Sequence, residues 1–466
     1  MTALALSRAI HDRHVSCVET MRAFLDDCAR HADRNAVVAL RPEGALMAEA
    51  EALDAEMDAG SSRGWLHGIP FAVKDLSPAA GLRFTQGSPL FADRVSEHDA
   101  PFVARIRAAG AVIAGRTNTP EWGLGSQTHN PVHGTTANAH DPALTSGGSS
   151  GGAAVALALG IVAVADGSDH AGSLRNPAGW NGVLGLRPTL GRVPDDVADP
   201  FSAGLSTAGP MARTVDDLAA LLATMAGPMP ALPLSLPDEE PTPAEPRGLR
   251  IGWLGDLDGR LAMEPGVIEA CEGALRALEE IGCVVEPARL GFPPERIWEA
   301  WTMLRHAAVG ASLGPLHDDP ASRDRLKPEA VWEVEGFRRM AARDLVAAQA
   351  VRGEWLRATL DLFGRHDVLA LPTAQVFPFP LDIHWPKEIA GRTMDSYHRW
   401  MEVAIPATMA GGPVLAVPVP GKHLMGLQLW GPWRSEGRLL SLGRAYEAAT
   451  GFPDRRPPTA SPDRAA

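Results

Sequence analysis

Two glycine-rich segments with serines at their centres lie close together in the sequence. The first is GGSSGG at 147–152, which contains Ser149 and Ser150, and the second is GSDHAGSLRNPA at 167–178, which contains Ser173. A serine can attack a carbonyl carbon when a base removes its proton and backbone N–H groups face the oxygen that becomes negative. The two segments therefore indicate a site of nucleophilic catalysis.

The first segment could also be a flexible linker or an anion-binding turn. Glycine and serine alone are typical of a solvated linker. This hexamer, however, runs directly into AAVALAL at 153–159, which predicts a buried helix, and the strand-like GIVAVADGSD follows at 160–169. A helix and a returning strand would bring Ser173 back to the hexamer, which favours the catalytic interpretation.

A catalytic serine needs a base, and two residues are candidates. Of the fifteen histidines, His170 is the one in a glycine-framed setting, three residues before Ser173. Lys74, in the apolar stretch GIPFAVKDL at 68–76, is the stronger candidate. Burial disfavours an ammonium and lowers its pKa, so the amine becomes a usable base. A lysine can act on a serine directly or through a second serine.

Composition restricts the function classes. The chain has 466 residues, of which 45% are hydrophobic, and a formal net charge of −13, which makes nucleic acid an improbable direct partner. The four cysteines form no CxxC pair and have no zinc-like spacing, which predicts reduced thiols. No apolar run reaches the roughly 18 residues of a membrane span. We therefore expect a cytoplasmic protein without a metal or organic cofactor.

Strand-like and helix-like segments alternate along the chain, which predicts an α/β fold with a largely buried sheet. Residues 1–60 are expected to be helical. Residues 228–246 contain seven prolines and four acidic residues and predict a surface connection between 68–227 and the final part, 247–466.

The quoted motifs resemble those of the amidase signature family of serine hydrolases. The family pattern places a GIPxxxKD strand before GGSSGG, followed by a helix and a second serine motif; here these are GIPFAVKD at 68–75, then 147–152 and 167–178. The resemblance is strong over residues 1–227 and looser beyond. It implies that 1–466 form one large amidase domain, with a mixed, mostly parallel sheet sandwiched between helices.

The resemblance also implies a role for each matching residue. Ser173 matches the nucleophile, Lys74 the base, and Ser149 a bridging serine that follows a cis peptide bond in the family. The remaining matches are backbone N–H groups of an oxyanion hole at His170, Ala171, Gly172 and Ser173, and supporting side chains at Ser150, Asp169 and Arg175. Asp169 and Arg175 are expected to form a buried ion pair that braces the turn.

Three departures from the family pattern concern the substrate more than the chemistry. Ser146 stands where proline is common, Ala139 and His140 replace a common Pro-Trp pair, and Ala171 stands where glycine is common. Residues 290–435 are expected to shape the pocket. Six tryptophans could line it, although core is the favoured interpretation for each because tryptophan is mostly buried: Trp298, Trp301, Trp385, Trp400, Trp430 and Trp433.

The predicted reaction is hydrolysis of a small-molecule carboxylic amide to an acid and ammonia or an amine. Two alternatives stay open: an amidotransferase subunit that releases ammonia from glutamine within a complex, and a catalytically silent binding protein on the same fold. Esters could be cleaved by the same acyl-enzyme route. A homodimer is the default expectation for the assembly.

Overall fold

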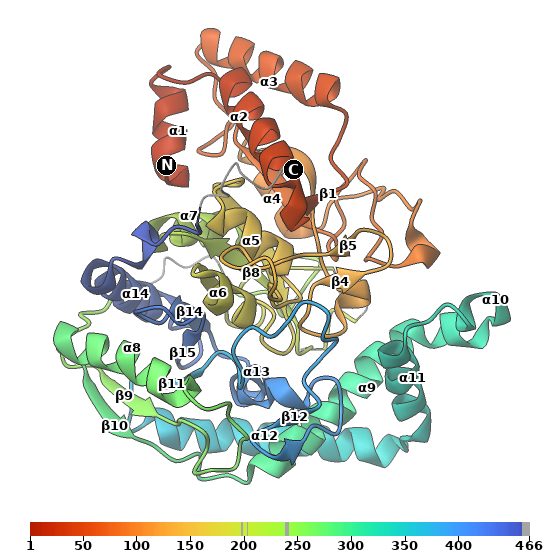
Figure 1. Cartoon of the computed structure of the whole chain (residues 1–466), viewed down its shortest axis with the longest axis vertical. Coiled ribbons are helices and arrows are strands. Elements are labelled where there is room, and N and C mark those ends of the chain that lie inside the picture. Colours follow the sequence, from red (N-terminus) through yellow and green to blue (C-terminus); the bar gives the residue numbers. More distant parts are fainter. Residues whose placement is uncertain (197–198, 203, 238–241, 459–466) are drawn as a thin grey trace.

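The computed structural model describes residues 1–196, 199–202, 204–237 and 242–458. Its strands form one eight-stranded sheet, one three-stranded sheet and two short two-stranded ribbons (Figure 1). All four cysteines are free thiols. Within these described ranges, no helix is long and apolar enough to cross a membrane.

The large sheet is mixed. Five of its strands run in one direction, and β15, β7 and β6 run in the other. Its order is β10 (Val284–Pro287), β9 (Arg250–Trp253), β11 (Val368–Pro372), β15 (Gly426–Trp430), β14 (Val414–Pro418), β7 (Leu184–Arg187), β8 (Thr207–Ala212) and β6 (Val164–Asp169).

Parallel neighbours occur in this sheet only where β9 pairs with β10 and β11, and the other described pairs are antiparallel. Parallel neighbours are few because strands that come later in the chain lie between strands that run in the same direction. Strands β6 and β7 flank a helix and run parallel, but β8 lies between them, and β15 likewise lies between β11 and β14. The predicted α/β fold with a mixed sheet is confirmed, with fewer parallel neighbours than the strand–helix alternation predicts.

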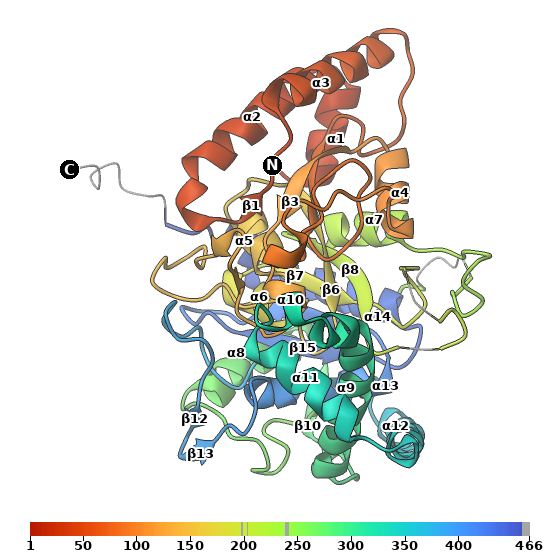
Figure 2. The ribbon, with the colours of Figure 1, turned by 90° about the vertical axis from the view of Figure 1, so that its right-hand side faces the viewer.

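Helices cover both faces of the sheet (Figures 1 and 2). Along β11, Ala370 packs into one hydrophobic core, while Leu369 and Leu371 pack into a second, because successive side chains of a strand point to opposite faces. The first core includes residues of α5 (Gly151–Ala158), α6 (Asn176–Asn181), α7 (Val215–Met225), α8 (Val267–Ile281) and α14 (Glu436–Thr450). The second core includes residues of α9 (Pro294–Asp318), α12 (Ala342–Phe363) and α13 (Ile405–Ala410).

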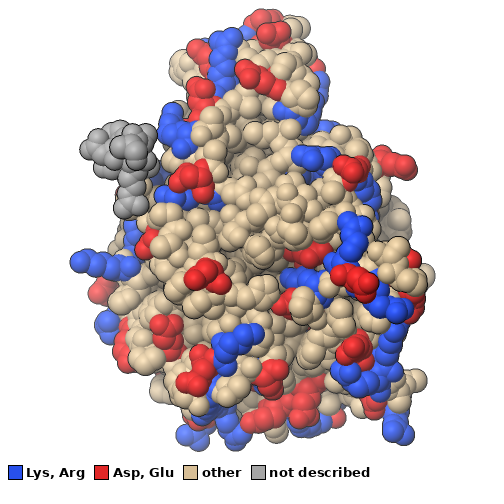
Figure 3. Space-filling view, turned by 45° about the vertical axis from the view of Figure 1, so that its right-hand side comes forward, with Lys and Arg blue, Asp and Glu red and all other residues tan. Residues whose placement is uncertain are grey.

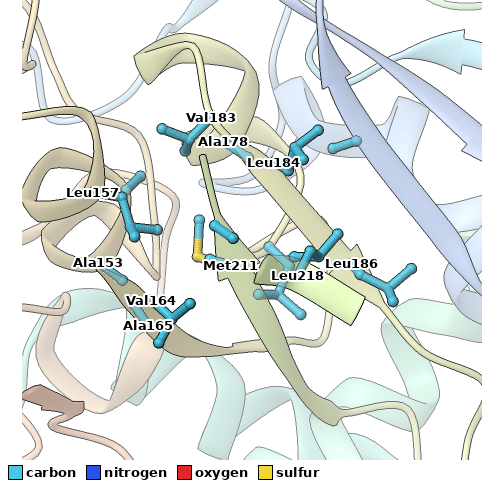
Figure 4. Close-up of a cluster of buried hydrophobic side chains, with 14 of the residues drawn as sticks. Ala153, Leu157, Val164, Ala165, Ala178, Val183, Leu184, Leu186, Met211 and Leu218 are labelled. Atoms are coloured by element: carbon cyan, nitrogen blue, oxygen red, sulfur yellow. The ribbon is translucent and has the colours of Figure 1, made fainter. Parts of the chain in front are cut away.

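The first core surrounds the helix that follows GGSSGG. Figure 4 shows Ala153 and Leu157 of α5 beside the part of β6 that contains Val164 and Ala165, with Met211 of β8 close by. All eight residues of α5 are buried. A short helix that is apolar on every side can form only inside the protein, which explains why the glycine–serine hexamer does not behave as a linker.

The N-terminal part adds helices and the small sheet, whose order is β1 (Val37–Val38), β3 (Val112–Thr117) and β2 (Pro70–Lys74). Strand β2 contacts β6, so the small sheet adjoins the edge of the large one. Helices of the expected 1–60 segment lie at one end of the molecule in Figure 1. They are α1 (Ala3–His11), α2 (Cys17–Arg30) and α3 (Glu43–Asp58), and α4 (Pro101–Ala108) follows.

The proline-rich segment 228–246 is described at 228–237 and 242–246. In those two stretches it contains no helix or strand and is exposed or half-exposed, as its composition predicts. Residues 238–241 of this segment lie outside the described residues.

Three helices of the second half project together on one side (Figure 1): α9, α10 (Pro320–Arg323) and α11 (Pro328–Arg339). On the face drawn in Figure 3, basic and acidic side chains are interspersed, and the middle of that face is largely uncharged.

Candidate active site

Lys74 is the last residue of β2 and is fully buried. Its Nζ lies 2.8 Å from Ser149 Oγ, 2.9 Å from Ser150 Oγ and 3.1 Å from Ser168 Oγ. Burial lowers the pKa of Lys74 to about 7, although the charges of Asp166 and Asp169 oppose this. An amine with such a pKa is present in part as the neutral base near pH 7, in contact with hydroxyl groups.

The hexamer presents its two serines to Lys74 at the start of α5. The peptide bond between Gly148 and Ser149 is cis. A Cβ atom at Gly152 would lie 2.3 Å from the Asn118 backbone nitrogen, so only glycine permits this close approach of the two chain segments. The Ser150 N–H donates to the carbonyl oxygen of Ser173 at 3.3 Å, which ties the hexamer to the second serine motif.

Ser173 lies in the tight turn between β6 and α6, and Asp169 holds that turn together. The Asp169 carboxylate accepts the N–H groups of Gly172 at 2.9 Å and Leu174 at 3.0 Å, and Gly172 has φ +99°, which favours glycine. Arg175 donates to both Asp169 oxygens, at 3.0 and 2.9 Å. The predicted buried ion pair is therefore present in the structure.

A second arginine strengthens this pair. Arg187 Nη1 lies 3.4 Å from Asp169 Oδ1, and all three side chains are fully buried. Burial alone would raise the pKa of the Asp169 carboxyl, but the two guanidinium groups hold it well below its usual range. Asp169 therefore stays ionised and acts as a fixed brace.

Ser149 and Ser173 both line one cavity of roughly 160 Å³. No hydrogen bond joins Ser173 Oγ to another group in the described part of the chain, and the residue is 7% exposed, which leaves its hydroxyl available to a molecule in the cavity. The polar part of the wall is completed by Ser126, Ser168, His170, Ser206 and Arg305. Its apolar part comes from Leu76, Trp122, Leu124, Ala171, Val309 and Met401.

His170, the second candidate for the base, is poorly suited to that role. Its Nδ1 lies 2.8 Å from Ser206 Oγ, and its Nε2 is buried without a hydrogen-bond partner among the described residues. Burial and the charges of Arg305 and Arg187 lower the pKa of His170 to about 3. Its imidazole is therefore neutral and a much weaker base than Lys74.

The four backbone N–H groups expected to form an oxyanion hole are not equivalent. That of Gly172 already donates to Asp169, whereas those of His170, Ala171 and Ser173 make no hydrogen bond among the described residues. Ala171 and Ser173 also line the cavity. The structure thus separates one bracing N–H group from three that are available.

Sequence reasoning missed several residues of the site. Asp166 accepts the Lys74 backbone N–H, and Ser168 is a third hydroxyl at Nζ; a carboxylate inside an apolar strand was a usable signal for the former. Trp122 and Arg305 also line the cavity; Arg305 belongs to a helix without a distinctive pattern, and nothing in the sequence marks Trp122 as a cavity residue. These positions depend on tertiary packing.

None of the six tryptophans considered for the pocket or the core is among the described residues that line this cavity. Trp298, Trp301, Trp400 and Trp430 are buried in the cores, while Trp433 is 43% exposed. Trp385 is partly buried. The core interpretation therefore holds for four of the six, and Trp122 is the tryptophan at the site.

Three of the residues that depart from the family motif contact one residue, Asn181, away from the cavity. Asn181 Nδ2 donates to the Ser146 carbonyl at 2.8 Å, its Oδ1 accepts the Ala139 N–H at 3.0 Å, and its own carbonyl lies 3.1 Å from His140 Nε2. Ala171, by contrast, contributes to the cavity wall. Of the four positions, only Ala171 can therefore touch a substrate directly.

Comparison with known proteins agrees with this fold. The model of the family Amidase matches residues 19–440, and the chain belongs to that family. It is 32% identical to an acylamidase of Rhodococcus erythropolis, over 98% of this chain and 97% of that protein. It is 33% identical to a glutamyl-tRNA(Gln) amidotransferase subunit of Acidothermus cellulolyticus, over 96% of this chain and 94% of that protein.

Similarity in structure extends over the whole chain. A bacterial aryl acylamidase of the amidase signature family superimposes with a TM-score of 0.92 at 25% identity and covers 99% of both chains. The resemblance inferred from the motifs is thereby confirmed, and so is the prediction that this chain is an amide-hydrolysing enzyme of that family.

Proposed function

We propose that the chain hydrolyses a small-molecule carboxylic amide through an acyl-enzyme on Ser173, with Lys74 as base and Ser149 as proton relay. The observation that carries this proposal is the 2.8 Å contact between the buried Lys74 amine and Ser149, which lines the same cavity as Ser173. A neutral amine held against a hydroxyl can accept its proton.

The reaction begins at the Lys74–Ser149 contact. Lys74 takes the Ser149 proton as Ser149 takes that of Ser173, and Ser173 Oγ forms a bond to the carbonyl carbon. The N–H groups of His170, Ala171 and Ser173 stabilise the negative oxygen. The carbon–nitrogen bond then breaks, and the proton returns through Ser149 to the leaving nitrogen. Water attacks the acyl-enzyme by the same route and releases the acid.

Ser150 and Ser168 support this chemistry. Both hydroxyls lie within 3.1 Å of Lys74 Nζ, so they hold the amine in place beside Ser149. Asp169 and Arg175 keep the nucleophile turn rigid, so that the amide donors need no reorganisation as charge develops.

The experiment that tests the proposal is labelling with a fluorophosphonate, followed by peptide mass spectrometry to locate the adduct. We expect the adduct on Ser173 and its loss or strong slowing in Lys74→Ala. Ser173→Ala should reduce turnover by several powers of ten. An adduct on a different serine, or turnover like that of the wild type in Ser173→Ala, would contradict the assignment. Absence of any labelling would favour the silent binding protein.

A second candidate, release of ammonia from glutamine within a complex, is favoured by the 33% identity to the amidotransferase subunit. Glutamine carries an α-ammonium, which an enclosed site usually pairs with a carboxylate. The described residues that line the cavity include no Asp or Glu. We therefore rank this candidate second. Ammonia release from glutamine that appears only with added partner proteins would reverse the ranking.

Finer features of the proposal concern assembly and location. We infer a homodimer because it is the commonest assembly of soluble proteins. We infer a cytoplasmic location from the four free thiols. Size-exclusion chromatography with light scattering tests the first. Ester hydrolysis is expected beside amide hydrolysis, because an acyl-enzyme forms from either.

A further inference from the structure

Arg305 brings a cation to the wall of the cavity that also contains Ser149 and Ser173. It belongs to α9, and it is the one Lys or Arg among the described residues that line this cavity. Its side chain is only 7% exposed. A guanidinium is rarely buried beside an otherwise uncharged wall unless its hydrogen-bonding groups are used.

Part of the guanidinium is held firmly by the protein. Glu333 Oε1 accepts from Nε at 2.6 Å, and the Tyr397 oxygen accepts from Nη2 at 2.6 Å while its hydroxyl donates to the same Glu333 oxygen at 2.5 Å. The guanidinium also lies over the rings of Trp301 and Tyr397, at 5.5 and 5.7 Å. These contacts fix the orientation of the fork before any ligand arrives.

The other part has no partner among the described residues. Nη1 makes no hydrogen bond with any described residue. It is not one of the fully buried polar atoms without a partner, so it keeps some exposed surface. Because Nε and Nη2 are held by Glu333 and Tyr397, Nη1 is the end of the side chain that can reach the cavity. Its two N–H groups suit an oxygen acceptor, which a planar guanidinium binds well.

We propose that Arg305 determines substrate specificity by binding an oxygen acceptor, a carboxylate or a second carbonyl, carried by the substrate apart from the amide that Ser173 cleaves. This inference rests on the proposed function for the location of the cleaved amide. The substrate class would be amides with an apolar spacer, which contacts Leu76, Val309 and Met401, and a terminal carboxylate or carboxamide. Simple alkyl amides would lack the second anchor.

The test uses binding to a Ser173→Ala protein, so that it does not depend on turnover. Isothermal titration calorimetry would compare glutaramic acid, glutaramide and hexanamide, which share an amide and a chain of similar length. We expect glutaramic acid or glutaramide to bind about 10- to 100-fold more tightly than hexanamide, the range for one charge-assisted hydrogen-bonded contact. Preference for the acid alone identifies a carboxylate anchor, and equal binding of both identifies a carbonyl anchor.

The same titration in Ser173→Ala/Arg305→Met should remove the difference between the compounds. Because Arg305→Met leaves the buried Glu333 with His306 but without its guanidinium partner, thermal melting is checked first, and Arg305→Met/Glu333→Gln replaces it if the single variant unfolds. Arg399→Met is the matched control: its guanidinium lies 4.1 Å over Trp298 and pairs with Asp395 outside the cavity. This control should keep the preference.

Three results would overturn the inference: equal binding of hexanamide and the acceptor compounds, equal weakening of all three in the Arg305 variants, or no detectable binding of glutaramic acid and glutaramide at millimolar concentration. Hydrolysis of the same compounds by the wild-type protein is measured separately. If the acceptor preference is present but none of the three amides is hydrolysed, the proposed cleavage of this substrate class at Ser173 fails, while oxygen-acceptor binding by Arg305 holds.

Discussion

Asp166 binds Lys74 through the lysine backbone, at the junction between β6 and β2. Its carboxylate oxygens lie 3.1 and 3.3 Å from the Lys74 nitrogen, and both side chains are fully buried. Burial raises the pKa of Asp166 to about 6 and lowers that of Lys74 to about 7, while the Asp166 charge opposes the second shift. The base proposed for catalysis therefore has a titrating neighbour.

Replacing Asp166 with Asn should move the pH dependence of activity toward lower pH. The variant keeps an oxygen that can accept the Lys74 N–H but loses the negative charge that stabilises the ammonium, so Lys74 loses its proton more easily. The measurement is kcat/KM against pH in both proteins. Asp217→Asn is the control, because Asp217 is also buried but binds the start of α1. An unchanged or higher midpoint in Asp166→Asn would count against this role.

Activity of the wild-type protein should rise with pH, with a midpoint near 7. The pKa of Lys74 is lowered to about 7, so the neutral amine that serves as base predominates above that value and the inactive ammonium below it. The profile of kcat/KM between pH 5 and 9 checks this. His170→Gln should keep the midpoint, because the pKa of His170, at about 3, lies outside the range. A midpoint that moves with His170 would transfer the role of base to the histidine.

The candidate site could be located from the sequence because its residues lie in short local patterns. Lys74, Ser149 and Ser173 each stand in a motif whose glycines and small residues mark close backbone contacts, and the structure brings Lys74 to Ser149 as predicted. The strand between these motifs was also found, because β6 (Val164–Asp169) lies within the apolar stretch 160–169, although it begins four residues later than that stretch.

The walls of the cavity were not predictable in the same way. Arg305 and Trp122 reach the site through the packing of α9 and of a short 3-10 helix, Glu121–Gly123, and no local pattern marks either residue as part of a cavity wall. For the tryptophans the core interpretation was the favoured one, and Trp301 and Trp430 are core residues; hydrophobicity predicts that a side chain is buried but does not show which tryptophan lines a cavity. Strand order was likewise beyond local patterns, since β8 lies between β6 and β7, and β15 lies between β11 and β14.

Replacing Asp169 with Asn should destabilise the protein strongly. The change removes the charge that compensates two fully buried guanidinium groups, Arg175 and Arg187, and such a loss costs about 3–5 kcal/mol. Urea unfolding measures the free energy. Asp216→Asn is the control, because its ion pair with Arg444 is largely exposed and is worth less than about 1 kcal/mol. Similar losses in the two variants would show that the Asp169 pairs do not brace the turn.

Replacing Gly152 with Ala should damage both stability and activity. The new Cβ would lie 2.3 Å from the Asn118 nitrogen and 2.6 Å from the Ala36 oxygen, both backbone atoms, so α5 and the preceding serines must shift. Overpacking of this kind costs about 1–3 kcal/mol, and a shift of Ser149 lengthens its contact with Lys74. Gly44→Ala is the control, because no atom lies within 4 Å of its added Cβ, and helical Ala is favoured over Gly. We expect Gly44→Ala to keep or raise the unfolding free energy; full activity and stability in Gly152→Ala would contradict the close packing at the hexamer.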